Sequence, residues 1–157
     1  RTVTERVTGE GGVLRSFRAT NPPGKNPPKW KSVKVSPIRD LWAAMLYLRS
    51  QPLAIGDTVR TLVFPGGSPY LVDIISVGVE PLDVLGSRID ALKLDVKIQH
   101  VNTKKGNMLE PHGKFRSGKI WLTADSERMP LRAEVDIFIG YVFAEVVALH
   151  TNQEARR

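Results

Sequence analysis

Apolar and polar residues alternate most regularly between residues 89 and 101. Aliphatic side chains occupy one set of alternate positions and charged or amide side chains the other: Leu92, Leu94, Val96 and Ile98 against Lys93, Asp95, Lys97 and Gln99. A period of two residues places these sets on opposite faces of a β-strand. The segment therefore predicts a strand with one dry and one wet face, which is typical of an antiparallel sheet.

Similar runs predict the other strands, which turn-forming residues separate. Two short runs on either side of residues 9–12 predict an N-terminal hairpin, and further strands are predicted at residues 30–35, 58–64, 70–79 and 119–124. The proline-rich residues 20–29 and the polar residues 102–114 are predicted to be loops.

The last predicted strand, residues 131–149, is about twice the usual length of ~5–6 residues. Gly140 lies near its middle, and we expect the strand to bend there because glycine tolerates a bulge. Asp125 lies in the polar turn before this strand, where an aspartate side chain hydrogen-bonds the backbone. We favour this structural role over an acid–base pair with Glu127, because both carboxylates would be solvated and ionised.

A different period, with apolar residues three or four positions apart, predicts one helix. Its apolar residues are Ile38, Leu41, Trp42, Met45, Leu46 and Leu48. Ser36 is a favourable N-cap, Pro37 suits the first helical position, and Pro52 should end the helix shortly before it. We expect the helix to be a main element of the core. Arg49, near its end, suits the helix dipole and can cap free carbonyl groups; an ion pair with Asp57 or Glu145 is the alternative.

One helix cannot cover a flat sheet of about seven or eight strands, whereas a twisted and bulged sheet can wrap around it. The predicted fold class is therefore mainly β (α+β), with a curved antiparallel sheet, or half-barrel, around one long helix. A length of 157 residues suits a single domain. Residues 1–34 would form a basic arm and hairpin, and residues 35–150 the helix and sheet.

Three segments and a later glycine resemble a bacterial family. They are Ser36-Pro37-Ile38-Arg39-Asp40, residues 46–56, residues 120–130, and Gly140 in the last strand. In order and spacing, across residues 36–149, they resemble the DUF3108 domains of unknown function. The resemblance implies a half-barrel with an enclosed helix, similar to envelope carriers of lipoproteins, and an exported or periplasmic location with a signal peptide. It also implies an apolar ligand but no catalytic residue. Because the chain begins with Arg1, we expect a processed product.

Charge and composition narrow the classes of partner. Residues 1–34 hold eight basic and two acidic residues, a balance of +6, and the other 123 residues hold 15 basic and 14 acidic residues, a balance of +1. A nucleic-acid groove would spread its charge along a face, and Lys29-Trp30-Lys31 offers one aromatic ring, so we do not expect a nucleic-acid partner. The absence of cysteine excludes disulfides and thiolate metal sites. No run is apolar for the ~18 residues of a membrane span.

The candidate site is an apolar cavity between helix and sheet, lined by Trp42, Met45, Tyr47 and Phe143. Plain core packing of these four side chains is the alternative. His100, His112 and His150 lack the spacing of metal ligands, so we expect no metal, and we expect no cofactor and no catalytic residue. The leading hypothesis is a non-enzymatic envelope domain that binds a lipid or another apolar moiety. The alternative is a protein-interaction or scaffold module that uses a sheet edge or the basic arm.

Overall fold

The structure is a computed structural model of the 157-residue chain. It describes residues 2–10, 13–21, 30–34, 37–65, 67–137 and 140–148, and the side chains of residues 37–65, 67–115, 117–137 and 140–148. Ser36, the predicted N-cap, and His150 lie outside the described residues, as do the side chains of the basic arm.

Two sheets contain the strands. The first sheet has the order β1-β2-β3, with β1 Thr2–Glu10, β2 Val13–Asn21 and β3 Trp30–Lys34. Its β1–β2 pairing confirms the predicted hairpin. The second sheet follows the order β11-β10-β9-β7-β6-β5-β4, and β8 pairs with β7. Its elements, with the helices between them, are β4 Ile38–Arg39, α1 Leu41–Ser50, β5 Thr58–Val63, β6 Tyr70–Val84, β7 Ser87–Asn102, η1 Thr103–Lys105, β8 Met108–Pro111, β9 Phe115–Thr123, β10 Pro130–Ile137 and β11 Gly140–Glu145.

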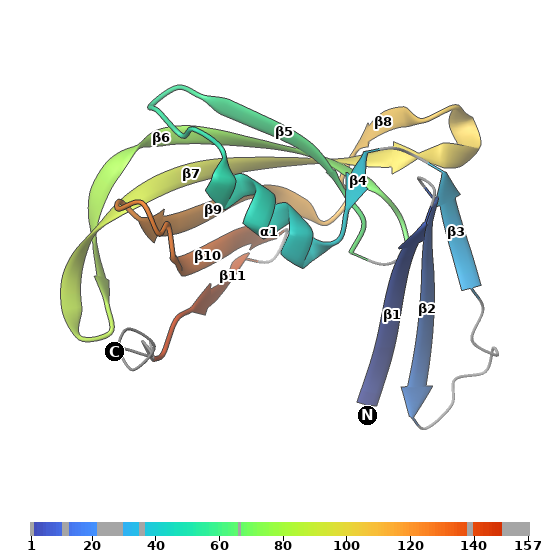
Figure 1. Ribbon diagram of the computed structural model, residues 1–157, viewed down its shortest axis with the longest axis horizontal. Helices are drawn as coiled ribbons and strands as arrows, with labels where there is room; N and C mark the ends of the chain where they lie inside the picture. The colour runs from blue at the N-terminus through green and yellow to red at the C-terminus, as the bar shows by residue number, and fades with distance from the viewer. Residues whose placement is uncertain are drawn as a thin grey trace, which may run out of the picture.

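The large sheet is curved, open and antiparallel except for the short parallel pair β4–β5. Figure 1 shows it arching over α1, with the three-stranded sheet beside the end of the arch that carries β4. This architecture confirms the predicted fold class, a curved sheet with one α-helix on its concave side.

A bulge in β6 contributes to the curvature. The β6–β7 register shifts between Ser76 and Gly78, and Gly78 has a φ of 157°. An extra residue in one strand bends it and reverses which face the following side chains occupy. Ile74 therefore packs under α1, whereas Leu82 packs on the opposite face.

Two strand predictions were wrong. Residues 131–149 do not form one bent strand, because β10 and β11 are antiparallel partners and Ile137 pairs with Gly140. Gly140 has a φ of 134°, a conformation that glycine adopts readily, so it serves a chain reversal and not a bend. The predicted loop 102–114 contains η1 and β8, whose pairing with β7 satisfies its backbone.

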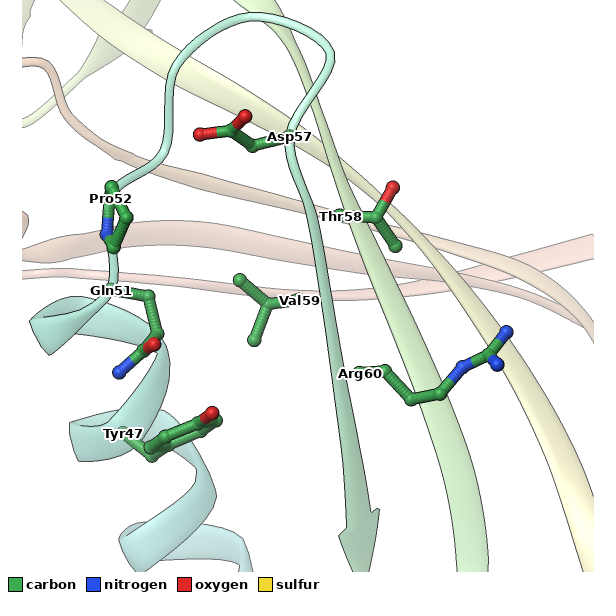
Figure 2. A pocket seen from close by; sticks show the side chains of 7 residues that line it. All are labelled: Tyr47, Gln51, Pro52, Asp57, Thr58, Val59 and Arg60. Atoms are coloured by element: carbon green, nitrogen blue, oxygen red, sulfur yellow. The ribbon is translucent and has the colours of Figure 1, made fainter.

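The helix differs from its prediction in its start and in its burial. It begins at Leu41, and the Asp40 carboxylate accepts a hydrogen bond from the Ala43 N–H at 2.8 Å, so Asp40 and not Ser36 is the N-cap. Pro37 precedes the two residues of β4 and is not helical. Only Ala44 and Leu48 are buried, so the helix is a partial cover of the sheet. Its C-terminal end lies beside the start of β5 (Figure 2).

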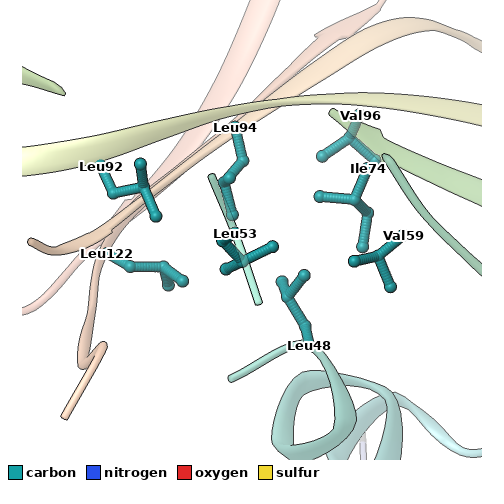
Figure 3. Packing of buried hydrophobic residues seen from close by; sticks show 8 residues of the cluster. All are labelled: Leu48, Leu53, Val59, Ile74, Leu92, Leu94, Val96 and Leu122. Carbon is teal, nitrogen blue, oxygen red and sulfur yellow. The ribbon is translucent and has the colours of Figure 1, made fainter. Parts of the chain in front are cut away.

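The main core lies between α1 and the sheet. Its buried residues, seen together in Figure 3, are Leu48, Leu53, Val59, Ile74, Leu92, Leu94, Val96 and Leu122. A second cluster lies on the opposite face and consists of Leu82, Val84, Ala91, Trp121 and Leu131. The buried Trp121 donates its indole N–H to the Glu80 carboxylate at 2.8 Å, which satisfies its polar atom.

Candidate functional site

The apolar face beneath α1 continues across three further strands. Residues paired directly across neighbouring strands share a face of the sheet. From β7 to β11 one row of paired residues runs Leu94, Ile120, Ala133, Ala144, and the next runs Val96, Gly118, Val135, Val142. Every residue in both rows is apolar, and we call the part contributed by β9, β10 and β11 the apolar floor.

Cover over this face decreases from β7 to β11. Leu94 and Val96 are buried beneath Leu48, Val135 and Ala133 are partly buried, and Val142 is 57% exposed. The floor is therefore a surface continuous with the core, which the helix does not reach at β11.

One side of α1 is apolar and exposed near the same strands. Trp42, Leu46 and Arg49 follow each other at intervals of four and three residues, so they lie on one side of the helix. Arg49 reaches from that side to the turn between β9 and β10, where its guanidinium donates to the Glu127 carbonyl at 2.7 and 3.1 Å. Trp42 is 79% and Leu46 62% exposed. This side of the helix therefore presents apolar surface toward strands β9 and β10, which carry part of the floor.

Beyond the second core cluster, the opposite face of the same strands is mostly charged. There the paired residues run Asp95, Lys119, Glu134 and Phe143 from β7 to β11. Arg132 and Glu145 also form an ion pair on this face, in which the Arg132 Nε and Nη2 both donate to the Glu145 Oε2. The apolar floor and the charged face thus belong to the same strands. Successive residues along each strand point alternately to one face and to the other.

The structure does not bring the four predicted ligand residues together. Met45 and Tyr47 pack against the main core, and Trp42 projects from the exposed side of α1. Phe143 lies on the charged face, because it pairs with Glu134, so it takes no part in a surface beneath the helix. The floor residues Val142 and Ala144 occupy the place expected for Phe143. Val142 and Ala144 alternate with Phe143 along the chain, and only the register identifies their face as the one beneath α1.

Arg49 takes part in a clasp between the helix and the sheet. Its guanidinium binds the Glu127 carbonyl, while Arg128 donates to the carbonyl of Arg49 at 3.1 Å and to that of Gln51. Arg128 therefore performs the capping role predicted for Arg49, and neither Asp57 nor Glu145 pairs with Arg49. We call these reciprocal contacts the arginine clasp.

Asp125 supports the clasp from within the β9–β10 turn. Its carboxylate accepts the Thr123 hydroxyl at 2.6 Å and the backbone N–H groups of Glu127 and Arg128 at 3.0 and 3.1 Å. These hydrogen bonds lower the pKa of Asp125 below its usual range, and the bond from the Thr123 hydroxyl has the largest effect. They also hold Arg128 at a φ of 47°, so Asp125 has the turn-forming role that the sequence predicts.

A pocket of about 260 Å³ lies where α1 ends beside β5 (Figure 2). Its lining residues are Tyr47, Gln51, Pro52, Asp57, Thr58, Val59 and Arg60. Asp57 accepts the Ala54 N–H at 2.8 Å, and Arg60 pairs with Asp73 at 2.6 Å. The pocket is smaller than the ~300–1,000 Å³ of typical ligand sites, and these contacts occupy its charged groups.

An aromatic cluster brings His100 and His112 close to one another. Both rings pack on Tyr70, with centroid distances of 5.6 and 5.3 Å. His112 accepts the N–H groups of Lys114 and Phe115 on its Nδ1, and burial is the main cause of its lowered pKa. Across the described part of the chain, no three histidine or carboxylate side chains converge to hold a metal ion.

Among the described residues, every carboxyl group whose pKa is clearly displaced is shifted downward. Arg60 lowers the pKa of Asp73, the Trp121 indole lowers that of Glu80, and Asn102 lowers that of Glu110. A general acid at neutral pH requires a raised carboxyl pKa, so these groups suit structural hydrogen bonds and not proton donation.

Comparisons with known proteins identify the family of the chain but no activity, ligand or partner. The family model described as "Protein of unknown function (DUF3108)" matches residues 9–147, which is most of the chain. The match begins within β1 and so extends further toward the N-terminus than the sequence resemblance did. No curated protein and no solved structure matches the chain. Among the described residues there is also no helix long and apolar enough to cross a bilayer.

Proposed function

The chain belongs to the DUF3108 family of proteins of unknown function, and we propose that it is a non-enzymatic binding domain for an apolar moiety. The moiety, such as an acyl chain, would lie on the apolar floor beside the exposed side of α1. The resemblance to envelope carriers suggests the same ligand class.

The uncovered floor is the single observation that carries this proposal. Soluble domains normally cover the apolar face of a sheet with another layer, yet here the rows ending at Ala144 and Val142 pass beyond the helix. An acyl chain on this surface would gain roughly 0.8 kcal/mol for each methylene group removed from water. The open floor therefore provides the driving force that a carrier requires.

The volume directly beneath α1 is not the proposed site. Leu48 is 1% exposed and packs with Leu53 against Leu94 and Leu122, so side chains already fill that space. We accordingly place the ligand beside the helix, over β9–β11, and not between the helix and the central strands.

Lipid extraction followed by mass spectrometry of the purified protein is the first test. We expect a co-purifying lipid or acyl compound at a substoichiometric to equimolar ratio. Titration with a fluorescent fatty acid then measures affinity directly. A protein that carries no apolar compound and gives no saturable binding contradicts the proposal.

A matched pair of variants locates the site. Val142 and Phe143 are adjacent in β11 and are 57% and 58% exposed, but they lie on opposite faces. We expect Val142→Asp to weaken probe binding at least tenfold, because it places a charge on the floor, and Phe143→Asp to leave it within about twofold. Equal effects of the two substitutions on probe binding would show that the floor is not the binding surface.

An envelope location is part of this proposal and is supported by the family resemblance. Expression of the natural gene product in its own bacterium, followed by separation of cytoplasmic and periplasmic fractions, tests it. Recovery in the cytoplasmic fraction alone would contradict an envelope role and leave the binding measurement unaffected.

A further inference from the structure

Strand β11 is a terminal strand of the large sheet and has little protection against pairing. In the described part of the chain its only strand partner is β10, so one side of its backbone faces outward. Residues 140–144 carry no charge, and Tyr141, Val142 and Phe143 are all more than half exposed. Natural edge strands usually carry lysine, proline or a bulge that prevents association.

The other end of the sheet is protected. Its last strand, β4, has two residues, Ile38 and Arg39, and it pairs with only the last two residues of β5. The first half of β5 carries the charged Arg60, and the end of α1 lies beside it (Figure 2). A short strand, a charge and a covering helix are the devices by which proteins block an edge. Their presence at one end makes the bare β11 edge the exception.

We propose that a second copy of this chain pairs with β11, antiparallel and about a two-fold axis at Val142. In this register Val142 lies opposite its own counterpart, and Tyr141 lies opposite the partner's Phe143. Each copy thus contributes to two aromatic cross-strand pairs, which stabilise antiparallel strands. A register centred on Phe143 would give one such pair.

Continuity of the two faces supports the same register. Directly opposed residues share a face, so pairing about Val142 joins the apolar floor of one copy to that of the other. A shift by one residue would place Val142 opposite Phe143 and join the floor to the charged face. This self-pairing also places no two like charges opposite one another, because residues 140–144 are uncharged and Glu145 is paired with Arg132.

The geometry limits assembly to a dimer. A two-fold contact uses the same edge of both copies and closes on itself. At the other end of the strand path of the large sheet lies the protected β4–β5 end, so strand addition does not continue along that path. The pairing requires no bound ligand, because the backbone edge and the side chains of β11 supply all of its contacts.

Sedimentation velocity of wild-type protein and of two double variants tests the pairing. We expect the wild type to dimerise, and Tyr141→Lys with Phe143→Lys to raise the dimer dissociation constant at least about tenfold by opposing two pairs of lysines. Tyr141→Lys with Phe143→Glu should restore the dimer, because each lysine then faces a glutamate. Leu46→Lys on α1, similarly exposed but outside the edge strand, should leave the dimer unchanged.

A cysteine substitution gives a second measurement that does not depend on introduced charges. The chain has no cysteine, so Val142→Cys can form a disulfide only with another copy. We expect rapid oxidation of Val142→Cys to a covalent dimer and slow oxidation of Leu46→Cys. A wild-type chain that stays monomeric at every concentration, or a dimer that the two lysines do not weaken, would overturn the proposal. Equal oxidation of the two cysteine variants would also overturn it.

Discussion

The face of the sheet beneath α1 has a covered half and an open half. Over β5, β6 and β7, Leu48 and Leu53 close the face, and the residues beneath them are buried. Over β10 and β11 the same apolar alternation continues, but Val142 and Ala144 are exposed. Alternation therefore specifies which face is apolar, and only the covering element decides whether that face becomes core or exposed surface.

The size of the helix explains the difference. Ten helical residues span ~15 Å, and a helix is ~10–12 Å wide. The strand path from β11 to β4 has six inter-strand spacings of ~4.8 Å, or ~29 Å in total. The helix cannot cover this width in either direction, so part of the sheet lies beyond its reach.

The largest expected effect is in the covered half. Leu48→Ala should lower the free energy of unfolding by about 2–5 kcal/mol, because it opens a cavity in packed core. Val142→Ala in the open half should cost less than about 1 kcal/mol, since the side chain is already largely in water. Urea denaturation of both variants measures the contrast. Similar losses in the two halves would contradict the division.

The arginine clasp holds the boundary of the covered half. Arg128→Asn keeps a residue that tolerates the positive φ of 47° but removes the hydrogen bonds to the end of α1. We expect a loss of about 1–3 kcal/mol in unfolding free energy. Arg60→Asn is the matched control: its pair with Asp73 lies on the other face and Arg60 is 66% exposed, so this substitution should cost clearly less than Arg128→Asn. A clasp variant no more costly than this control would show that the contacts do not stabilise the helix.

Trp42 provides a sharper test of the open half, because binding and stability should separate there. Its side chain is 79% exposed, so Trp42→Gln should change the unfolding free energy by less than about 0.5 kcal/mol. We expect the same substitution to weaken fatty-acid binding about tenfold, as it removes a large apolar contact. Unchanged affinity would place the ligand away from α1.

The smallest effect is expected at His112, at the end of the covered half near β8. Burial holds its pKa below the ordinary value of 6.5, so the folded state favours the neutral ring, whose Nδ1 accepts two N–H bonds. Its contribution to stability is therefore present above pH 6.5 and is lost as the pH falls through the folded pKa. Thermal unfolding between pH 7.5 and 5 should show a decline that His112→Asn reduces, because an amide oxygen can replace Nδ1 without titrating. An identical decline in the variant would assign it to other groups.

The sequence predicted the elements whose periodicity was strong and failed where register or capping decided. Residues 89–101 form part of β7 with the expected faces, and the sheet curves around one helix as expected. The hairpin at Gly140 was missed because apolar residues continue on both sides of it, so the pattern offers no interruption. The N-cap was misplaced because both Ser36 and Asp40 are favourable caps, and the pairing of β4 with β5 decides between them.

The residues of the candidate surface were predicted only in part. An apolar surface involving Trp42 was expected, but Phe143 was assigned to it because the side of the sheet that faces α1 depends on long-range pairing. The partnership of Arg49 with the Glu127 carbonyl joins residues 78 positions apart. No local spacing signals such a contact, whereas the turn chemistry of Asp125 is local and was predicted.

The most direct test of the open floor is nuclear magnetic resonance of the protein with a spin-labelled fatty acid. The spin label broadens the amide signals of residues close to it and so maps where the chain lies. We predict saturable broadening at Ala133, Val135, Val142 and Ala144, with little effect at Leu82 and Val84 on the opposite face. Broadening centred on the opposite face, or none at any residue, would contradict the account.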